Sequence, residues 1–291
     1  MIKVEHIKNT NSIKLYNNNT EAIVDLENGA SLSSLKLKGK NILADLPKSS
    51  YSKTYASSIL FPFANRISNG KYELNNKSLE LTCNDADNNN ALHGLIYNKS
   101  FNLIHTEIKE NYSEITLEYS EEKRESGFPF IYKIVVKYKI TNSSLELNLN
   151  VINTDKNEFP YTVGWHPYFY SSDLDNSQLI FKADKKVVHN TKMITESLIE
   201  FNDNQQLKLE NLDDCFALTN NTIEFKTPEN HIQLKTNHPK SYLQIYTPKN
   251  KNTIAIEPLT GISDSFNNKV GLQILKPNTN FEVAWSIHLK G

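Results

Sequence analysis

The strongest constraint on the fold of this chain is a period-two alternation of apolar and polar residues. In YKIVVKYKI, residues 132–140, tyrosine, isoleucine and valine side chains fall on one face of an extended chain, and three lysines fall on the other. After the polar turn TNSS, residues 145–151 alternate leucine and valine with glutamate and asparagine. Because successive side chains of a strand point to opposite faces, two such runs around a short turn predict a β-hairpin.

Similar alternation continues through most of the sequence, which indicates an all-β protein. It recurs in SEITLEYS, TIEFKT, HIQLKT, YLQIYTP, TIAIEP and FEVAWSIHL. Short strands separated by clusters of Asn, Ser, Gly and Pro are typical of a large antiparallel β-sandwich or barrel. The polar DADNNN stretch, residues 85–90, is interpreted as a loop. Since no linker or shift in composition divides the chain, we expect one domain over residues 1–291.

Charge and cysteine content argue against several classes of function. Lysines and arginines number 32 and acidic residues 33, without a concentrated basic run, so we expect no nucleic-acid partner. No apolar run is long enough for a signal peptide or a membrane span, which predicts a cytoplasmic protein that does not enter a membrane. The two cysteines, Cys83 and Cys215, are far apart, and the sequence has no paired metal-ligand spacing and no glycine-rich phosphate loop. We therefore expect no disulfide, no metal and no cofactor.

Four segments interrupt the alternation with residues that strand formation does not require. They are FPFANRISNGKY with Asn65 and Arg66, ALHGLIY with His93, TVGWHPYF with His166, and TIAIEPLTGISDSFNN with Glu257. Asn65 and Arg66 offer hydrogen-bond donors and an acceptor that suit sugar hydroxyls or a carboxylate. The simpler interpretations, taken one residue at a time, are an arginine that holds its own loop, structural histidines and a solvated glutamate.

Two of these residues are expected where strands end. A residue before proline favours extended backbone, so His166, which precedes Pro167, is expected at the end of a strand. Pro258 is expected to end the strand of TIAIEP, which places Glu257 at a strand end. By alternation, Glu257 points away from the face that carries the two isoleucines of that strand.

Taken together and in order, the four segments resemble the aldose 1-epimerase (galactose mutarotase) family. The resemblance runs from FPFANRISNGKY to IEPLTGISDSFNN, which is most of the chain. It implies a large antiparallel β-sandwich, the galactose mutarotase-like supersandwich, and cofactor-free interconversion of the α and β anomers of free sugars. The HPYFYSS and EPLTG sequences depart from those of galactose mutarotases proper and are typical of broader branches of the family.

The resemblance also implies a role for each residue of the site. His166 matches the general acid, Glu257 matches the general base, and His93 resembles the histidine that assists at the ring oxygen. The substrate-binding residues that it implies are Asn65, Arg66, Tyr168, Gln244 and Asp213, with the neighbouring Asp214 as an alternative to Asp213. Trp165 and Tyr168 are expected to supply apolar contact to the faces of a sugar.

The implied reaction explains why both an acid and a base are needed. Ring opening takes a proton from the anomeric hydroxyl and gives one to the ring oxygen, and closure reverses both transfers. Histidine suits this task near neutral pH, and a glutamate does so if burial raises its pKa. Two other interpretations stay open: a non-catalytic carbohydrate-binding or sugar-sensing protein, and an epimerase for sugar phosphates. The joint presence of His166 and Glu257 favours the free-aldose epimerase, and only Lys71 lies near Arg66 in sequence as a second basic residue.

Overall fold

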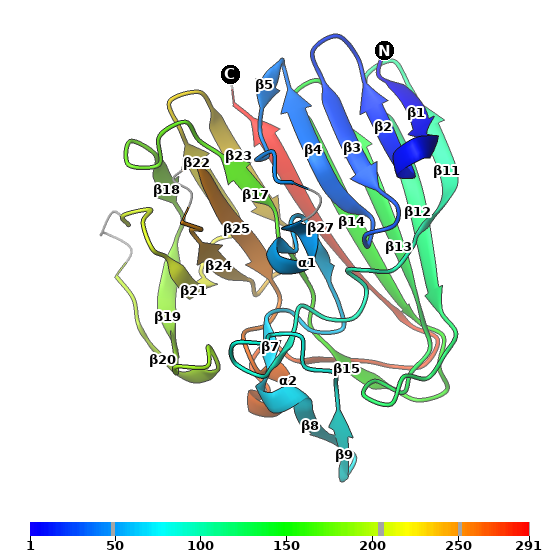
Figure 1. The fold of residues 1–291 in the computed structure, drawn as a ribbon, viewed down its shortest axis with the longest axis vertical. Coiled ribbons are helices and arrows are strands. Elements are labelled where there is room, and N and C mark those ends of the chain that lie inside the picture. The colour runs from blue at the N-terminus through cyan, green and yellow to red at the C-terminus, as the bar shows by residue number, and fades with distance from the viewer. Residues whose placement is uncertain (48–49, 203–206, 250–251, 291) are drawn as a thin grey trace.

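The computed structural model describes residues 1–47, 50–202, 207–249 and 252–290, and it is built almost entirely of antiparallel strands (Figure 1). The helical segments in these ranges are single turns: α1 (Tyr51–Thr54), α2 (Ser265–Asn268) and the 3-10 turns Lys8–Thr10 and Ser68–Gly70. No helix of the described ranges is long and apolar enough to cross a membrane. The prediction of an all-β antiparallel fold is confirmed.

The longest sheet has eight strands and forms one layer of the molecule. In spatial order, its strands are β11 (Asn102–Ile108), β12 (Ser113–Glu121), β13 (Tyr132–Ile140), β14 (Ser144–Asn153), β27 (Asn280–Leu289), β23 (His231–Thr236), β22 (Thr222–Lys226) and β18 (Gln178–Ile180). The predicted hairpin is β13–β14, in which Tyr138 pairs with Leu147. Its apolar residues are buried, as the alternation predicts.

A second eight-stranded sheet carries most of the candidate site and is called the site sheet here. Along its path, the strands are β20 (Thr195–Glu200), β19 (Ala183–His189), β21 (Asp213–Leu218), β24 (Tyr242–Tyr246), β25 (Thr253–Leu259), β16 (Gly164–Trp165) and β6 (Ile59–Leu60), and β17 (Tyr168–Tyr170) pairs with β25.

Pro258 does not end its strand, contrary to expectation, because β25 runs on to Leu259. The backbone amides of Ile256 and Thr260 donate to carbonyls of Pro167 and Val163, on the side of β17 and β16. By alternation, the nitrogen of Pro258 faces the same side, where the chain leaves the sheet between these two strands. The proline therefore costs the strand no hydrogen bond to β24, and the strand continues.

The remaining strands form a five-stranded N-terminal sheet and three small ribbons. The N-terminal sheet consists of β1 (Lys3–Ile7), β2 (Ser12–Tyr16), β3 (Glu21–Asp25), β4 (Ser31–Leu37) and β5 (Lys40–Asn41). The ribbons are β7 (Arg66–Ile67) with β10 (Ala91–Leu92), β8 (Lys71–Leu74) with β9 (Lys77–Glu80), and β15 (Phe159–Tyr161) with β26 (Gln273–Leu275). Figure 1 shows the N-terminal sheet and the site sheet in front of different parts of the long sheet.

The core lies between these layers. One cluster of buried apolar residues includes members of the long, site and N-terminal sheets. Trp165 of β16 packs on Trp285 of β27 with ring centroids 6.3 Å apart, and Phe169 of β17 packs on Phe225 of β22 at 6.2 Å. Trp165 is fully buried in this layer, so the expectation that it contacts a sugar is wrong. The fold is the predicted sandwich, and its single-domain character stays a prediction.

Candidate active site

Three strands of the site sheet align polar side chains on the face opposite to the core. Gln244 of β24 stands opposite Glu257 of β25 in the register, and Asp213 begins the neighbouring strand β21. Ile254 and Ile256 belong to the core cluster, so the alternation of β25 directs Glu257 to the outer face, as predicted. The sheet thus carries a row of acid and amide groups that come from three separate strands.

His166 lies in the two-residue connection between β16 and β17. Its carbonyl accepts a hydrogen bond from the amide of Ser57 at 2.8 Å, and its amide donates to the carbonyl of Ser58 at 3.1 Å. Trp165 precedes His166 and points into the core, so the histidine side chain points outward. The backbone therefore holds the imidazole over the face that carries Glu257.

The imidazole and the carboxyl group meet there. Nε2 of His166 lies 3.3 Å from Oε1 of Glu257, and the two side chains are only 6% and 3% exposed. The other polar atom of each group, Nδ1 of His166 and Oε2 of Glu257, is buried without a hydrogen-bond partner among the residues that the structure describes. Buried polar atoms without partners are rare in folded proteins, and these two atoms have hydrogen-bonding capacity left for a ligand.

Burial changes the protonation of this pair. It lowers the pKa of His166 to about 4 and raises the pKa of Glu257 well above its ordinary value. Both shifts disfavour charge, so when the pair carries one proton the favoured arrangement is a neutral imidazole facing a protonated carboxyl group. Because the two groups are coupled, the relevant quantity is the proton that the pair shares.

Aromatic rings flank the pair. Tyr168 stacks on His166 with centroids 5.0 Å apart and planes inclined by 19°, and His93 approaches His166 edge-on, also at 5.0 Å. Tyr55 in turn packs edge-on against His93 at 4.8 Å. Burial is the main cause that lowers the pKa of His93 well below its ordinary value, and the neighbouring His166 and Arg66 lower it further. His93 is therefore a neutral hydrogen-bonding group at physiological pH.

His93 and Asn65 adopt left-handed backbone conformations that bring their side chains to the site. Their φ angles are 61° and 58°, which are unfavourable for residues other than glycine, although less so for Asn and His. The amide of His93 donates to the carbonyl of Asn65 at 2.8 Å, next to the pairing of Leu92 with Arg66 in the β7–β10 ribbon. Strain of this kind often occurs at functional sites.

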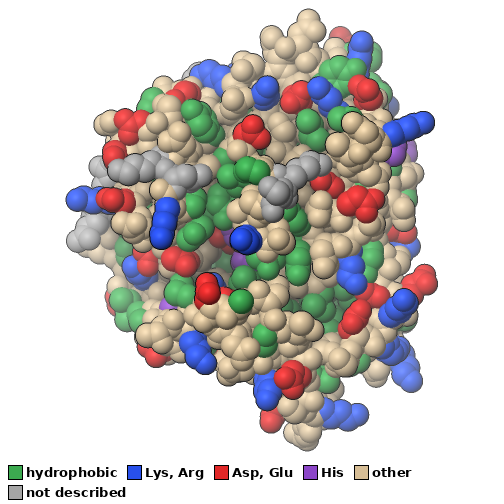
Figure 2. All heavy atoms as spheres, viewed as in Figure 1, with side chains coloured by type: hydrophobic (Ala, Val, Ile, Leu, Met, Phe, Trp, Pro, Cys, Tyr) green, Lys and Arg blue, Asp and Glu red, His purple; other side chains and the backbone are tan. Residues whose placement is uncertain are grey.

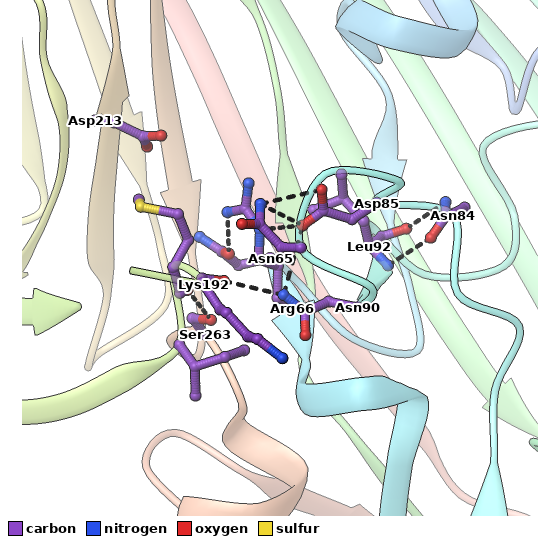
Figure 3. Close-up of polar contacts among 12 residues, drawn as sticks. Asn65, Arg66, Asn84, Asp85, Asn90, Leu92, Lys192, Asp213 and Ser263 are labelled. Carbon is purple, nitrogen blue, oxygen red and sulfur yellow. Dashed lines mark hydrogen bonds and ion pairs between the residues drawn. The ribbon is translucent and has the colours of Figure 1, made fainter. Parts of the chain in front are cut away.

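The predicted binding residues form a continuous chain of hydrogen bonds. Nη1 of Arg66 donates to Oδ1 of Asn65 at 3.2 Å, and Nδ2 of Asn65 donates to Oε1 of Gln244 at 3.2 Å. Nε2 of Gln244 donates to Oδ1 of Asp213 at 2.7 Å. Figure 3 shows Asp213 pointing from β21 towards Asn65 and Arg66.

The structure distinguishes Asp213 from Asp214, which the sequence left as alternatives. Asp213 bonds to Gln244 within the site, whereas Asp214 pairs with Lys186 at 2.8 Å. Adjacent residues of β21 point to opposite faces, so only Asp213 can join the row on the outer face. Burial raises the pKa of Asp213, and the charge of Arg66 acts in the opposite direction.

Two residues of this region were missed by the sequence analysis. One is Tyr55, which packs on His93, and the other is Asp85 of the DADNNN loop. Oδ2 of Asp85 accepts a hydrogen bond from Nε of Arg66 at 2.8 Å (Figure 3). A loop rich in Asn and Asp does not show by its sequence which carboxylate is buried, so no sequence signal identified Asp85.

The arrangement suits the movement of a proton on a small polyhydroxylated molecule. An acid–base pair lies beside an aromatic ring and amide, guanidinium and carboxyl groups that can bind hydroxyls. On the face drawn in Figure 2, the surface is hollowed near its centre, with histidine visible in the hollow. Within the described ranges, no three His, Cys, Asp or Glu side chains are grouped to hold a metal ion.

Comparisons with known proteins agree with the resemblance read from the sequence. Residues 11–288 match the model of the family described as aldose 1-epimerase. The uncharacterized protein YihR of Escherichia coli strain K12 is 20% identical over 274 residues, which cover 89% of this chain and 87% of YihR.

Two solved structures share the fold. A galactose mutarotase-like protein from Clostridium acetobutylicum superposes with a TM-score of 0.86 and 20% identity, over 100% of this chain and 98% of that one. Galactose 1-epimerase from Lactobacillus acidophilus NCFM gives a TM-score of 0.80 and 18% identity, over 96% of this chain and 94% of its own. These likenesses establish the galactose mutarotase-like supersandwich.

Proposed function

Since the chain belongs to the aldose 1-epimerase family, we propose that it is an isomerase that interconverts the α and β anomers of a free aldose without a cofactor. The observation that carries this proposal is the buried His166–Glu257 pair, with Nε2 and Oε1 3.3 Å apart. A binding protein needs hydroxyl ligands and an aromatic ring, but it does not need an acid and a base held together in a desolvated position.

In the proposed reaction, Glu257 accepts the proton of the anomeric hydroxyl while His166 gives a proton to the ring oxygen. The bond between the anomeric carbon and the ring oxygen breaks, and the anomeric carbon becomes a free aldehyde. Rotation about the neighbouring carbon–carbon bond and closure, with both proton transfers reversed, gives the other anomer. Glu257 gains one proton from the sugar and His166 gives one to it, so the pair carries one titratable proton both before and after ring opening.

Burial favours the direction of ring opening. Ring opening starts from the charged form of the pair, a carboxylate and an imidazolium, which burial makes the less populated form, and it ends in the favoured neutral form. The same desolvation that lowers the pKa of His166 and raises that of Glu257 therefore promotes transfer of both protons. Closure regenerates the charged pair while the sugar still occupies the site.

The proposed binding roles follow the hydrogen-bond chain of the site. Asn65, Arg66, Gln244 and Asp213 are proposed to bind the sugar hydroxyls, and Tyr168 to contact a face of the ring. His93, which approaches the edge of His166 at 5.0 Å, is proposed to assist at the ring oxygen as a neutral imidazole. Neutral imidazole can donate a hydrogen bond without competing for the proton that moves.

The proposal is tested by NMR exchange spectroscopy on a panel of aldoses, with and without the protein. We expect cross-peaks between the anomers of at least one aldose at a rate that grows with protein concentration. If the protein binds an aldose by calorimetry but leaves the exchange rate of every aldose at the buffer value, it is a binding protein and the proposed function is wrong.

A further inference from the structure

Asp85 is a buried carboxylate that accepts several hydrogen bonds. Its carboxylate, 9% exposed, accepts from Nε of Arg66 at 2.8 Å and from Nδ2 of Asn88 at 3.2 and 3.1 Å. Burial opposes its ionisation, but the hydrogen bond and charge of Arg66, together with the hydrogen bonds of Asn88 and Asn90, outweigh burial, so the pKa of Asp85 lies below its ordinary value. Asp85 is therefore an ionised partner that holds the guanidinium by its Nε edge.

The fixed guanidinium determines how the next two side chains are oriented. Arginine only donates hydrogen bonds, so the group of Asn65 that faces Nη1 must be its carbonyl oxygen. The amide nitrogen of Asn65 then faces Gln244, which must present its own oxygen. This leaves the nitrogen of Gln244 for Asp213, an acceptor at the far end of the chain. The guanidinium of Arg66 therefore determines which group donates and which accepts in each hydrogen bond of the chain.

Asp85 also balances charge beside the acid–base pair. Burial is the main cause of the perturbed pKa values of His166 and Glu257, but the positive charge of Arg66 acts on both and lowers each of them. The carboxylate of Asp85, bonded to the same guanidinium, opposes that field. At Glu257 the carboxylate of Asp213 also opposes the field of Arg66 and raises the pKa. Loss of the Asp85 charge leaves that field less compensated, and Glu257 then releases its proton at lower pH.

We propose that Asp85 is a positioning residue of this site, which fixes Arg66 and thereby the orientation of Asn65 and Gln244, and which compensates the charge of Arg66 next to Glu257. Its kinetic consequences rest on the proposed function, whereas its electrostatic consequences do not. Asp85 touches neither the acid nor the base, so it acts only through Arg66.

The test compares Asp85→Asn with a matched control, Asp155→Asn. Asp155 is likewise a buried aspartate. It pairs with Arg124 and accepts hydrogen bonds from the backbone amides of Ile131 and Asn157. The titration of Glu257 is followed by ¹³C NMR in protein labelled at the glutamate carboxyl groups, with Glu257→Gln to assign the signal. We expect Asp85→Asn to lower the Glu257 midpoint by roughly half to one pH unit and Asp155→Asn to leave it unchanged.

A comparison of KM with kcat then distinguishes a positioning role of Asp85 from a general loss of structure. With an aldose that the parent interconverts, Asp85→Asn should raise KM by about 10- to 100-fold, the usual worth of a hydrogen bond to a charged group. Because Asp85 contacts neither the acid nor the base, kcat should change by a smaller factor than KM. Asp85→Glu keeps the charge but displaces the guanidinium, so it should leave the Glu257 midpoint in place while still raising KM.

Each outcome decides the matter. An unchanged Glu257 midpoint in Asp85→Asn, or an equal shift in Asp155→Asn, overturns the proposal. If Asp85→Asn does not fold, Asp85→Glu replaces it, and parental KM in that variant overturns the positioning role. If the parent interconverts no aldose, the proposed function fails, while the NMR titration still confirms or overturns the electrostatic role of Asp85.

Discussion

Replacement of Glu257 by glutamine separates catalysis from binding at this site. Glutamine keeps the size of the side chain, and Oε2 of Glu257 has no hydrogen-bond partner among the described residues for the new amide to disturb. Burial already favours the neutral carboxyl group, so a neutral glutamine at this position leaves no buried charge without its partner. We therefore expect the variant to fold with stability close to that of the parent.

The expected loss lies in the rate. A positioned general base contributes about 10²- to 10⁴-fold, which corresponds to about 2.7 to 5.4 kcal/mol of activation free energy. Sugar affinity should change by less than about tenfold, because the chain from Arg66 to Asp213 is intact. The matched control is Glu121→Gln, at another buried glutamate, whose Oε2 accepts from Tyr119 on β12.

The assay is polarimetric decay of a freshly dissolved α-anomer, with calorimetric binding of the same sugar. Glu121→Gln should decay at the parental rate, and Glu257→Gln should decay near the buffer rate while it still binds. A Glu257→Gln variant as fast as the parent refutes the assignment of Glu257 as base. Loss of binding equal to the loss of rate shows instead that Glu257 is a binding residue.

Three further predictions follow from the protonation and ligand chemistry of the site. kcat/KM should stay constant from neutral pH down to about pH 5 and decrease at lower pH, because the His166–Glu257 pair takes a second proton only near the His166 pKa of about 4. A decrease of kcat/KM centred near pH 6.5 contradicts this prediction. Burial lowers the pKa of His189 to about 4, so between pH 6.5 and 4 the unfolded chain binds the proton and the folded protein does not. As the pH falls through that window, the parent should therefore lose roughly 1 to 2 kcal/mol of unfolding free energy relative to His189→Gln. Urea denaturation measures both proteins, and a difference in unfolding free energy that does not change with pH contradicts the prediction. Exhaustive treatment with a chelator should leave mutarotation unchanged, because the sequence has no metal-ligand spacing, and a loss that only one divalent ion restores would reveal a metal site.

Local periodicity was sufficient to predict the strands of the clearly alternating runs and the faces of their side chains. The pleat of a strand relates neighbours in sequence, so the alternation in TIAIEP correctly placed Glu257 opposite the core face of β25. The same rule, extended from β16 to the residue that follows it, indicates that Trp165 and His166 point to opposite faces, and the structure puts the tryptophan in the core. The order of the four motifs was sufficient to identify the family.

Only the tertiary structure decided which of these residues meet. The approach of His166 to Glu257 depends on the register between β25 and the strands on either side of His166, which are about ninety residues away in sequence and are aligned by packing. The choice of Asp213 over Asp214, and the burial of Asp85 against Arg66, likewise depend on partners distant in the chain. Pro258 continues its strand because its nitrogen faces the opening between β16 and β17. Sequence patterns determine how a residue is oriented within its own strand, whereas the packing of sheets determines its partners, its burial and hence its pKa.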